Sequence, residues 1–162
     1  MIAIQIKNNT GFSLMEIMIG IAIVGILTGI ALPQYQTYVA QTEVIRAVTE
    51  AKSLTPIVEM CIEHQYTTVA AGTACQNTFQ GSNILVGNGN GIADLSTGEG
   101  APTITINIDF TANISATLGG NATNVLNSSL VSLDRNSNGR WTCTFSGNVK
   151  YAPISCPVAA ME

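Results

Sequence analysis

The spacing of hydrophobic positions changes along the first half of the chain. Residues 17–42 carry no charge and are mostly apolar, which, together with residues 12–15, is long enough for one membrane-spanning helix of about 20 residues. A helix from about Phe12 to about His64 would be roughly 80 Å long at 1.5 Å per residue, so half of it must leave the membrane. In that second half, apolar residues recur at steps of three or four and predict one buried stripe, formed by Ala40, Val44, Ala47, Ala51, Leu54, Val58 and Ile62.

Further along, apolar and polar residues alternate strictly from Ile104 to Leu118, and Gly119-Gly120 follows. A period of two predicts β-structure. Because the stretch exceeds a usual strand length, it forms either one long bent strand or two strands with a break near Thr111.

Two shorter strands are expected at residues 130–133 and 141–145. The turn between them, residues 134–139, contains Asn138-Gly139 as the expected turn dipeptide. The sequence therefore predicts an α+β fold in which a long N-terminal helix packs on a small antiparallel sheet.

Residues 65–102 are rich in Gly, Asn, Thr and Ser, and the run at residues 87–91 is expected to be their most flexible part. We interpret this region as a long surface connection. Glycine and proline also occur within the helical segment and weaken a helix. Gly25 and Pro33 predict that the helix is locally soft between them, and Pro56 predicts a bend. Membrane helices tolerate both residue types, so these positions could also be without consequence.

Glu16 is the single charged residue at the start of the apolar run. A charge in hydrocarbon costs roughly 2.5 kcal/mol or more by insertion scales, so Glu16 should have a function or a partner. The alternative is that it marks the membrane boundary. Ahead of it, the small residue Gly11 precedes the apolar run, whereas the cleavage site of a conventional secretory signal follows that run. A cut at Gly11 would leave the anchor attached.

The run Gly11-Phe12-Ser13-Leu14-Met15-Glu16-Ile17-Met18-Ile19 resembles the prepilin motif of type IV pilins. The similarity continues at Gly25, Pro33, Tyr35, Tyr38 and the segment Lys150-Tyr151-Ala152-Pro153. The resemblance implies that a membrane prepilin peptidase cuts between Gly11 and Phe12, that the new amine of Phe12 is N-methylated, and that Glu16 guides assembly.

The resemblance also implies a division of the chain into a leader (residues 1–11), a transmembrane and polymerisation half of the helix (12–39) and a globular pilin part (40–162). The implied partners are further copies of the chain in a helical filament, the prepilin peptidase and methyltransferase, the pilus assembly machinery and, before assembly, membrane lipid. The precursor would reside in the inner membrane and the product in an extracellular pilus that serves adhesion, twitching motility or DNA uptake.

Four cysteines permit three pairings. Their separations suggest the local pairs Cys61–Cys75 and Cys143–Cys156, each worth roughly 3 kcal/mol in the chain-entropy model. The alternative is a four-cysteine metal site, but no C-x-x-C spacing occurs and His64 is the one histidine. Disulfides require an oxidising compartment, in agreement with translocation of everything after the apolar run.

Composition narrows the functional classes. Charged residues make up 10% of the chain and mean hydropathy is +0.32, as suits a subunit that buries surface against lipid and against copies of itself. The net charge of −4, which becomes −5 once Lys7 leaves with the leader, does not favour direct binding of nucleic acid. No nucleophile, base and orienting group can be assembled, so we expect no enzyme, cofactor or metal.

Two local patterns imitate ligand loops. Residues 87–91 lack the Lys-Ser/Thr and the strand-to-helix context of a phosphate loop. Residues 134–139 read D-x-N-x-N-G, but Phe145 stands where a calcium loop needs a bidentate Glu, which favours a hairpin turn.

Three functional hypotheses therefore stand. The first is a major pilin of a type IV pilus. The second is a minor pilin or a pseudopilin of type II secretion, against which the C-terminal cysteine segment and Glu16 weigh. The third is a signal-anchored periplasmic binding domain, which would need neither the Gly11-Phe12 junction nor Glu16.

Overall fold

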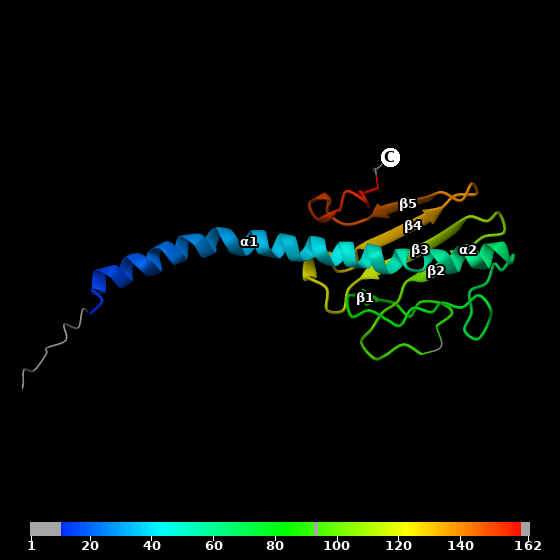
Figure 1. Cartoon of the computed structure of the whole chain (residues 1–162), viewed down its shortest axis with the longest axis horizontal. Helices are drawn as coiled ribbons and strands as arrows, with labels where there is room; N and C mark the ends of the chain where they lie inside the picture. The colour runs from blue at the N-terminus through cyan, green and yellow to red at the C-terminus, as the bar shows by residue number, and fades with distance from the viewer. Residues whose placement is uncertain (1–10, 93, 160–162) are drawn as a thin grey trace, which may run out of the picture. The chain divides into compact units, whose positions relative to one another are not determined.

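The computed structural model describes residues 11–92 and 94–159 of the chain and divides it between Gln36 and Thr37 into two units. We call residues 11–36 the apolar segment and residues 37–159 the head. The architecture is α+β, and Figure 1 labels its helices and strands: α1 (Leu14–Lys52), α2 (Thr55–Glu63), β1 (Leu85–Val86), β2 (Thr103–Ile106), β3 (Ala112–Leu118), β4 (Leu130–Arg135) and β5 (Trp141–Phe145). The head also contains two 3₁₀ turns, η1 (Asn124–Leu126) and η2 (Val149–Tyr151).

The expected single helix is two helices. α1 ends at Lys52 and α2 begins at Thr55, so the bend predicted near Pro56 is a break. Pro56 has no N–H to donate to the Lys52 carbonyl, and the Thr55 hydroxyl donates to that carbonyl instead, at 2.9 Å. Pro33, by contrast, lies inside α1, which continues through it.

The predicted stripe on the helix forms one side of the core of the head. All of its positions are buried except Ile62, which is half-buried. Cys61, three residues after Val58, takes the inner position next to it and is disulfide-bonded. The amphipathic spacing therefore identified the buried face correctly up to the last turn of α2.

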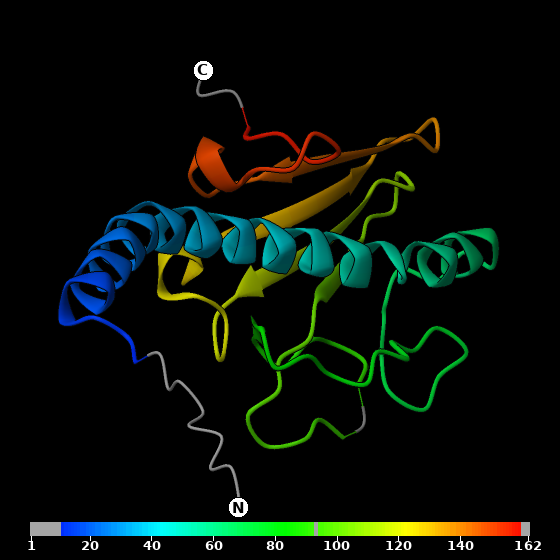
Figure 2. The same cartoon turned by 60° about the vertical axis from the view of Figure 1, so that its left-hand side comes forward.

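The sheet of the head is antiparallel and is built around β3 (Figure 2). β4 pairs with one edge of β3, and β2 and β1 pair one after the other with its opposite edge. β5 extends the sheet beyond β4. The inward-facing residues of the strands share one core with the helical stripe: Leu85, Ile104, Ile106, Ala112, Ile114, Ala116, Leu118, Val131, Leu133 and Phe145.

The alternating stretch forms two strands with a break near Thr111, as one of the two interpretations predicted. β2 ends at Ile106, residues 107–111 form a hairpin loop, and β3 begins at Ala112. Ile108 and Phe110 continue the alternation but lie in this loop, where they are 87% and 42% exposed. Alternation alone does not distinguish a loop that presents apolar side chains from a strand.

The turn between β4 and β5 differs from a two-residue Asn-Gly turn. β4 reaches Arg135, and the turn closes with the Gly139 N–H donating to the Asn136 carbonyl and the Asn136 N–H donating to the Arg140 carbonyl, both at 3.0 Å. Gly139 has a φ of 80°, whereas Asn138 has no positive φ. The turn therefore needs glycine at position 139, where φ is positive. It is not a type I′ turn, which would require a positive φ at Asn138 as well.

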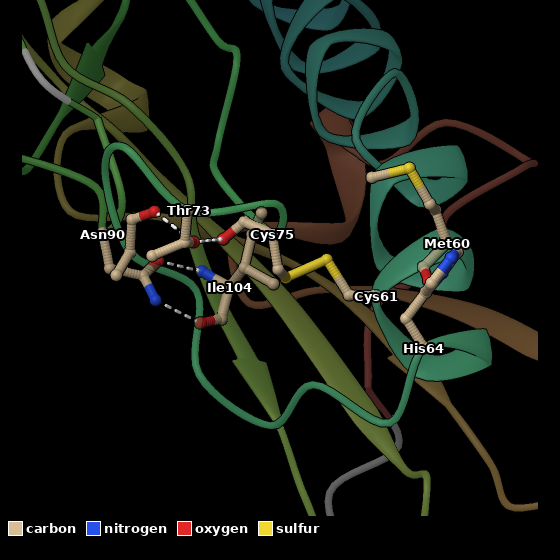
Figure 3. The surroundings of a disulfide bond; sticks show 8 residues. Met60, Cys61, His64, Thr73, Cys75, Asn90 and Ile104 are labelled. Atoms are coloured by element: carbon tan, nitrogen blue, oxygen red, sulfur yellow. Dashed lines mark hydrogen bonds between the residues drawn. A yellow bond between two sulfur atoms is a disulfide. The ribbon is translucent and has the colours of Figure 1, made fainter.

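The expectation that residues 65–102 are a surface connection is wrong in part. Ile84 and Leu85 are buried, and β1 pairs with the end of β3. Within the glycine run, the Asn90 amide accepts from the Ile104 N–H at 2.6 Å and donates to the Ile104 carbonyl at 2.5 Å (Figure 3). This side chain covers the outer edge of β2, which would otherwise present unpaired backbone groups.

Candidate assembly site

The apolar segment is exposed along its whole described length. Every residue from 11 to 36 is classed as exposed. An 18-residue window of the helix has a mean hydropathy of 2.3, so the helix is long and apolar enough to cross a membrane. Exposed apolar area of this extent marks a surface that lipid or protein covers. The large side chains that form it are Phe12, Leu14, Met15, Ile17, Met18, Ile19, Ile21, Ile23, Val24, Ile26, Leu27, Ile30 and Leu32.

Glu16 is the acidic residue in the first turn of α1. A negative charge there interacts favourably with the helix dipole. The Ser13 carbonyl accepts the N–H groups of Glu16 at 3.1 Å and Ile17 at 3.3 Å, which starts the helix without using the carboxylate. Within residues 11–92 and 94–159 the Glu16 carboxylate has no hydrogen bond or ion pair. A partner that neutralises it in an apolar environment must therefore come from outside this part of the chain.

The Gly11-Phe12 junction precedes α1. Gly11, Phe12 and Ser13 are exposed and have no regular secondary structure, which leaves the predicted cleavage site accessible. The rest of the expected leader, residues 1–10 with Lys7, lies outside the described residues.

The polar and helix-weakening residues of the apolar segment lie within α1. The Thr28 hydroxyl donates to the Val24 carbonyl at 2.5 Å and to the Gly25 carbonyl at 3.3 Å, so it needs no external partner in an apolar environment. A Cβ at Gly25 would meet nothing within 4 Å. The packing of this chain therefore gives no reason for a glycine there, and the softness predicted at Gly25 and Pro33 stays a prediction.

The four cysteines lie in the head, away in sequence from the other expected site residues. Cys61 of α2 is bonded to Cys75 of the following loop, with 5.4 Å between Cα atoms (Figure 3). Cys143 of β5 is bonded to Cys156 of the C-terminal segment, with 4.8 Å between Cα atoms. Beside the second bond, the Phe145 N–H donates to the Pro157 carbonyl at 2.9 Å. The C-terminal segment thus covers the outer edge of β5.

A polar cluster that the sequence did not predict ties α2 to the sheet. Arg135 Nε and Nη2 donate to the two carboxylate oxygens of Glu59, each at 2.9 Å. Trp141 Nε1 donates to the same carboxylate at 2.8 Å, and Arg135 Nη1 donates to the Phe110 carbonyl at 2.7 Å. Glu59 is not one of the apolar positions of the predicted stripe, and the spacing of the helix gave no sign of this role. The one sequence feature that could have indicated this cluster is the predicted hairpin, because its strands pair Arg135 with Trp141.

The electrostatics of this cluster favour the charged pair. The hydrogen bonds from Arg135 hold the pKa of Glu59 below its ordinary value, against desolvation, which raises it, and with help from Trp141. The hydrogen bonds to Glu59 raise the pKa of Arg135. Since none of these groups is free to react, the cluster acts as a structural tie.

Residues 134–139, which imitate the first half of a calcium loop, form the end of β4 and the turn after it. Asp134 lies in β4, where its carboxylate accepts from the Asn113 amide at 2.6 Å and the Ser132 hydroxyl at 3.0 Å. In the part of the chain that the structure describes, no three His, Cys, Asp or Glu side chains are grouped so that they could hold a metal ion.

The described chain combines an exposed apolar segment, long and apolar enough to cross a membrane, with a disulfide-bonded α+β head. Two family matches agree with this architecture: residues 40–157 match the Pilin family, described as "Pilin (bacterial filament)", and residues 6–32 match the prokaryotic N-terminal methylation motif. The chain belongs to the pilin family.

Relatives of the chain are similar over nearly their whole length. "Type IV major fimbrial protein FimA" of Dichelobacter nodosus is 35% identical over 90% of this chain and 94% of its own length. "Fimbrial protein" of Pseudomonas aeruginosa is 33% identical over 93% and 98% of the two chains. "Probable minor fimbrial protein" of Dichelobacter nodosus is 32% identical over 93% and 96%.

Proposed function

We propose that the chain is a structural subunit of a type IV pilus filament and that it polymerises through its apolar segment. The observation that carries the proposal is the continuous exposed apolar surface of residues 12–36, interrupted by the single charge of Glu16. The names of the relatives as fimbrial proteins support it.

The same surface would serve two environments in turn. In the membrane, lipid covers the apolar side chains, and in the filament the same side chains of neighbouring copies cover one another. The head keeps its own core in both states, because its stripe and sheet are already packed together. Transfer from lipid to filament then requires no unfolding of the head.

Glu16 gives the transfer its electrostatic component. After cleavage between Gly11 and Phe12, the new amine of Phe12 is a cation at the end of the apolar segment. Attraction between this amine in one subunit and the Glu16 carboxylate in its neighbour would relieve the burial of both charges. Among residues 11–92 and 94–159 the Glu16 carboxylate has no hydrogen bond or ion pair, which supports this role.

Processing and location follow from the same proposal. The prepilin peptidase would remove residues 1–11 and N-methylate Phe12 in the inner membrane, and the assembly machinery would then move the subunit into an extracellular pilus. The match to the methylation motif over residues 6–32 supports this order. The filament would serve adhesion, twitching motility or DNA uptake.

A minor pilin is the second candidate, because one relative is named as a minor fimbrial protein. Glu16 favours a major subunit, and the bond between Cys143 and Cys156 weighs against a pseudopilin. The two candidates differ in abundance within the filament.

Peptide mapping of surface filaments sheared from cells tests the proposal. We expect the main protein band to be this chain and to begin with N-methylated Phe12. The matched variant Gly11→Val should leave uncleaved precursor in the membrane and no filament. A main band from another pilin, with this chain in trace amounts, would assign the chain to the minor class, and its absence from every filament would overturn the proposal.

A further inference from the structure

The head presents two different apolar projections at its two ends. Where the head begins, Gln41 Nε2 donates to the Lys150 carbonyl at 2.9 Å and the Glu43 carboxylate accepts from the Thr123 N–H at 2.8 Å, so η1 and η2 lie beside this part of α1. At the other end, Arg135 connects the β2–β3 loop to α2 through its hydrogen bond to the Phe110 carbonyl and its ion pair with Glu59. Glu43 and Glu59, the anchors of the two ends on the helices, are sixteen residues apart, or roughly 24 Å at 1.5 Å per residue.

The first projection is the β2–β3 loop, residues 107–111, which we call the tip loop. Ile108 is 87% exposed and Phe110 is 42% exposed. Asp109, also exposed, is the one charged residue of the loop. These two side chains offer apolar area at the loop tip that a docked surface could bury.

The tip loop is held in one conformation. The Asp109 carboxylate accepts from the Thr111 N–H at 3.1 Å and from the Thr111 hydroxyl at 2.7 Å, and the Asn107 amide donates to that hydroxyl at 2.9 Å. Arg135 fixes the Phe110 carbonyl, and Phe110 has a φ of 62°, which a bulky residue rarely adopts. A loop held in this way loses little conformational entropy when it binds.

The second projection is η2, at the opposite end of the head. Val149 is 75% exposed, and Lys150 next to it is exposed and is the one charged residue between residues 145 and 159. Among the described residues Lys150 has no ion pair, and its ammonium group lies 5.8 Å from the centre of the Tyr151 ring. The Asn148 side chain caps the turn by accepting from the Lys150 N–H at 2.9 Å.

The two projections are complementary. The tip loop presents an apolar residue followed by an acid, Ile108-Asp109, and η2 presents an apolar residue followed by a base, Val149-Lys150. Because they lie at opposite ends of the head, one chain cannot bring them together. Contacts between unlike surfaces of identical subunits generate helical filaments when the rotation does not close a ring.

We propose that the tip loop of one head docks on η2 of another copy of this chain in the filament, with Ile108 against Val149 and Asp109 paired with Lys150. This inference rests on the proposed filament function and adds a contact between heads to the contacts of the apolar segments. The charged pair selects the register of the contact, and the apolar pair contributes the buried area.

Zero-length cross-linking of wild-type filaments tests the contact directly. A water-soluble carbodiimide joins a carboxylate to an amine only where the two touch, so we expect a cross-linked peptide that contains Asp109 and Lys150. Because the two projections lie at opposite ends of the head, we expect this product to join two chains. Lys52, the other lysine after the leader, is the internal control. Filaments that give other cross-linked peptides but not this one would overturn the proposal.

Uncharged variants provide the second arm. Asp109→Asn keeps the oxygen that accepts from Thr111 and Lys150→Gln keeps the length of the side chain, so each removes the charge with little change in the loop. We expect each to increase the pilin released from filaments by heat about fivefold, and the double variant to release no more than either single variant. Val86→Ser, an exposed apolar change outside the contact, should have no effect. Additive effects of the two charge changes would contradict a direct pair.

The proposed filament function and the proposed contact between heads can be disproved separately. If wild-type cells carry no filament that contains this chain, the proposed function is wrong. If such filaments form but lack both the cross-link and the non-additive release, the contact between heads is wrong and the filament function stands.

Discussion

The two parts of α1 show how one helix can carry two surfaces. From Leu14 to Gln36 apolar side chains occur on every side of the helix and all are exposed. From Thr37 to Lys52 the apolar side chains form one stripe, in which Ala40, Val44, Ala47 and Ala51 are completely buried. The second part is covered by the sheet of its own chain, whereas the described residues leave the first part exposed.

The head, in contrast to the apolar segment, leaves few groups without partners. Asn90 covers the edge of β2 and the C-terminal segment covers the edge of β5. Among the described residues, one buried side-chain oxygen, Oε2 of Glu50, has no hydrogen-bond partner. The comparison teaches that the head is stable through its own contacts and that the apolar segment depends on other molecules.

The largest predicted difference comes from the same substitution in the two parts. Leu54 is 2% exposed and Leu27 is 61% exposed. We expect Leu54→Ala to lower the free energy of unfolding of the head by about 3 kcal/mol and Leu27→Ala to change it by less than about 0.5 kcal/mol. Urea unfolding of the full chain in detergent, followed by the fluorescence of Trp141, measures both. Equal effects would contradict the division of the helix into a packed and an unpacked part.

The two disulfides should stabilise the head by similar amounts. Each closes a loop of 14 or 13 residues, so removing either pair with Cys→Ser changes should cost roughly 3 kcal/mol of unfolding free energy. Peptide mapping without reduction provides the control, with Cys61–Cys75 and Cys143–Cys156 as the expected bridges. A peptide that joins Cys61 to Cys143 or Cys156 would show that the pairing is wrong.

The sequence predicted those features of the head that depend on periodicity and failed where side chains meet across elements. The stripe from Ala40 to Val58 and the strands around Thr111 follow from spacing, which is a local property. The contact of Glu59 with Arg135 joins residues 76 positions apart, and no local pattern encodes it. The pairing of β1 with β3 was missed for the same reason, because Leu85 lies in a polar region rich in glycine.

More of the candidate assembly site than of the head could be predicted from the sequence. Its features, namely a junction at Gly11, a lone Glu16 and an apolar run, occupy one continuous segment. The sequence could not show that Ile108 is exposed on a fixed loop, because the alternation that contains it continues on both sides into residues that are buried in strands, Ile106 before it and Ala112 after it.

A change at Glu59 should have a smaller effect on the free energy of unfolding, and this effect should depend on pH. We expect Glu59→Gln to lower the free energy of unfolding by about 2 kcal/mol at neutral pH, less than for a fully buried pair because the Glu59 side chain is 38% exposed. Since its pKa is lowered in the folded state, the stabilisation is complete above the unfolded pKa of about 4.3 and is lost as the pH falls through the lower folded pKa.

Unfolding measured from pH 7 to pH 3 tests this dependence. The difference between wild type and Glu59→Gln should be constant down to about pH 4.3 and then shrink. Glu63→Gln, a change at an exposed position in the same helix, is the matched control. A difference that did not vary with pH would mean that the ion pair does not stabilise the head.

The central claim is that the apolar segment polymerises and that Glu16 recruits the next subunit. Filament counts by electron microscopy, with the amounts of inserted and cleaved protein measured by blot, test it most directly in Glu16→Val. We expect normal amounts of cleaved, folded protein and few or no filaments. Thr28→Val, which also makes the segment more apolar but removes a hydroxyl that is already bonded within the helix, should keep normal filaments. Normal numbers of filaments built from Glu16→Val alone would contradict the account.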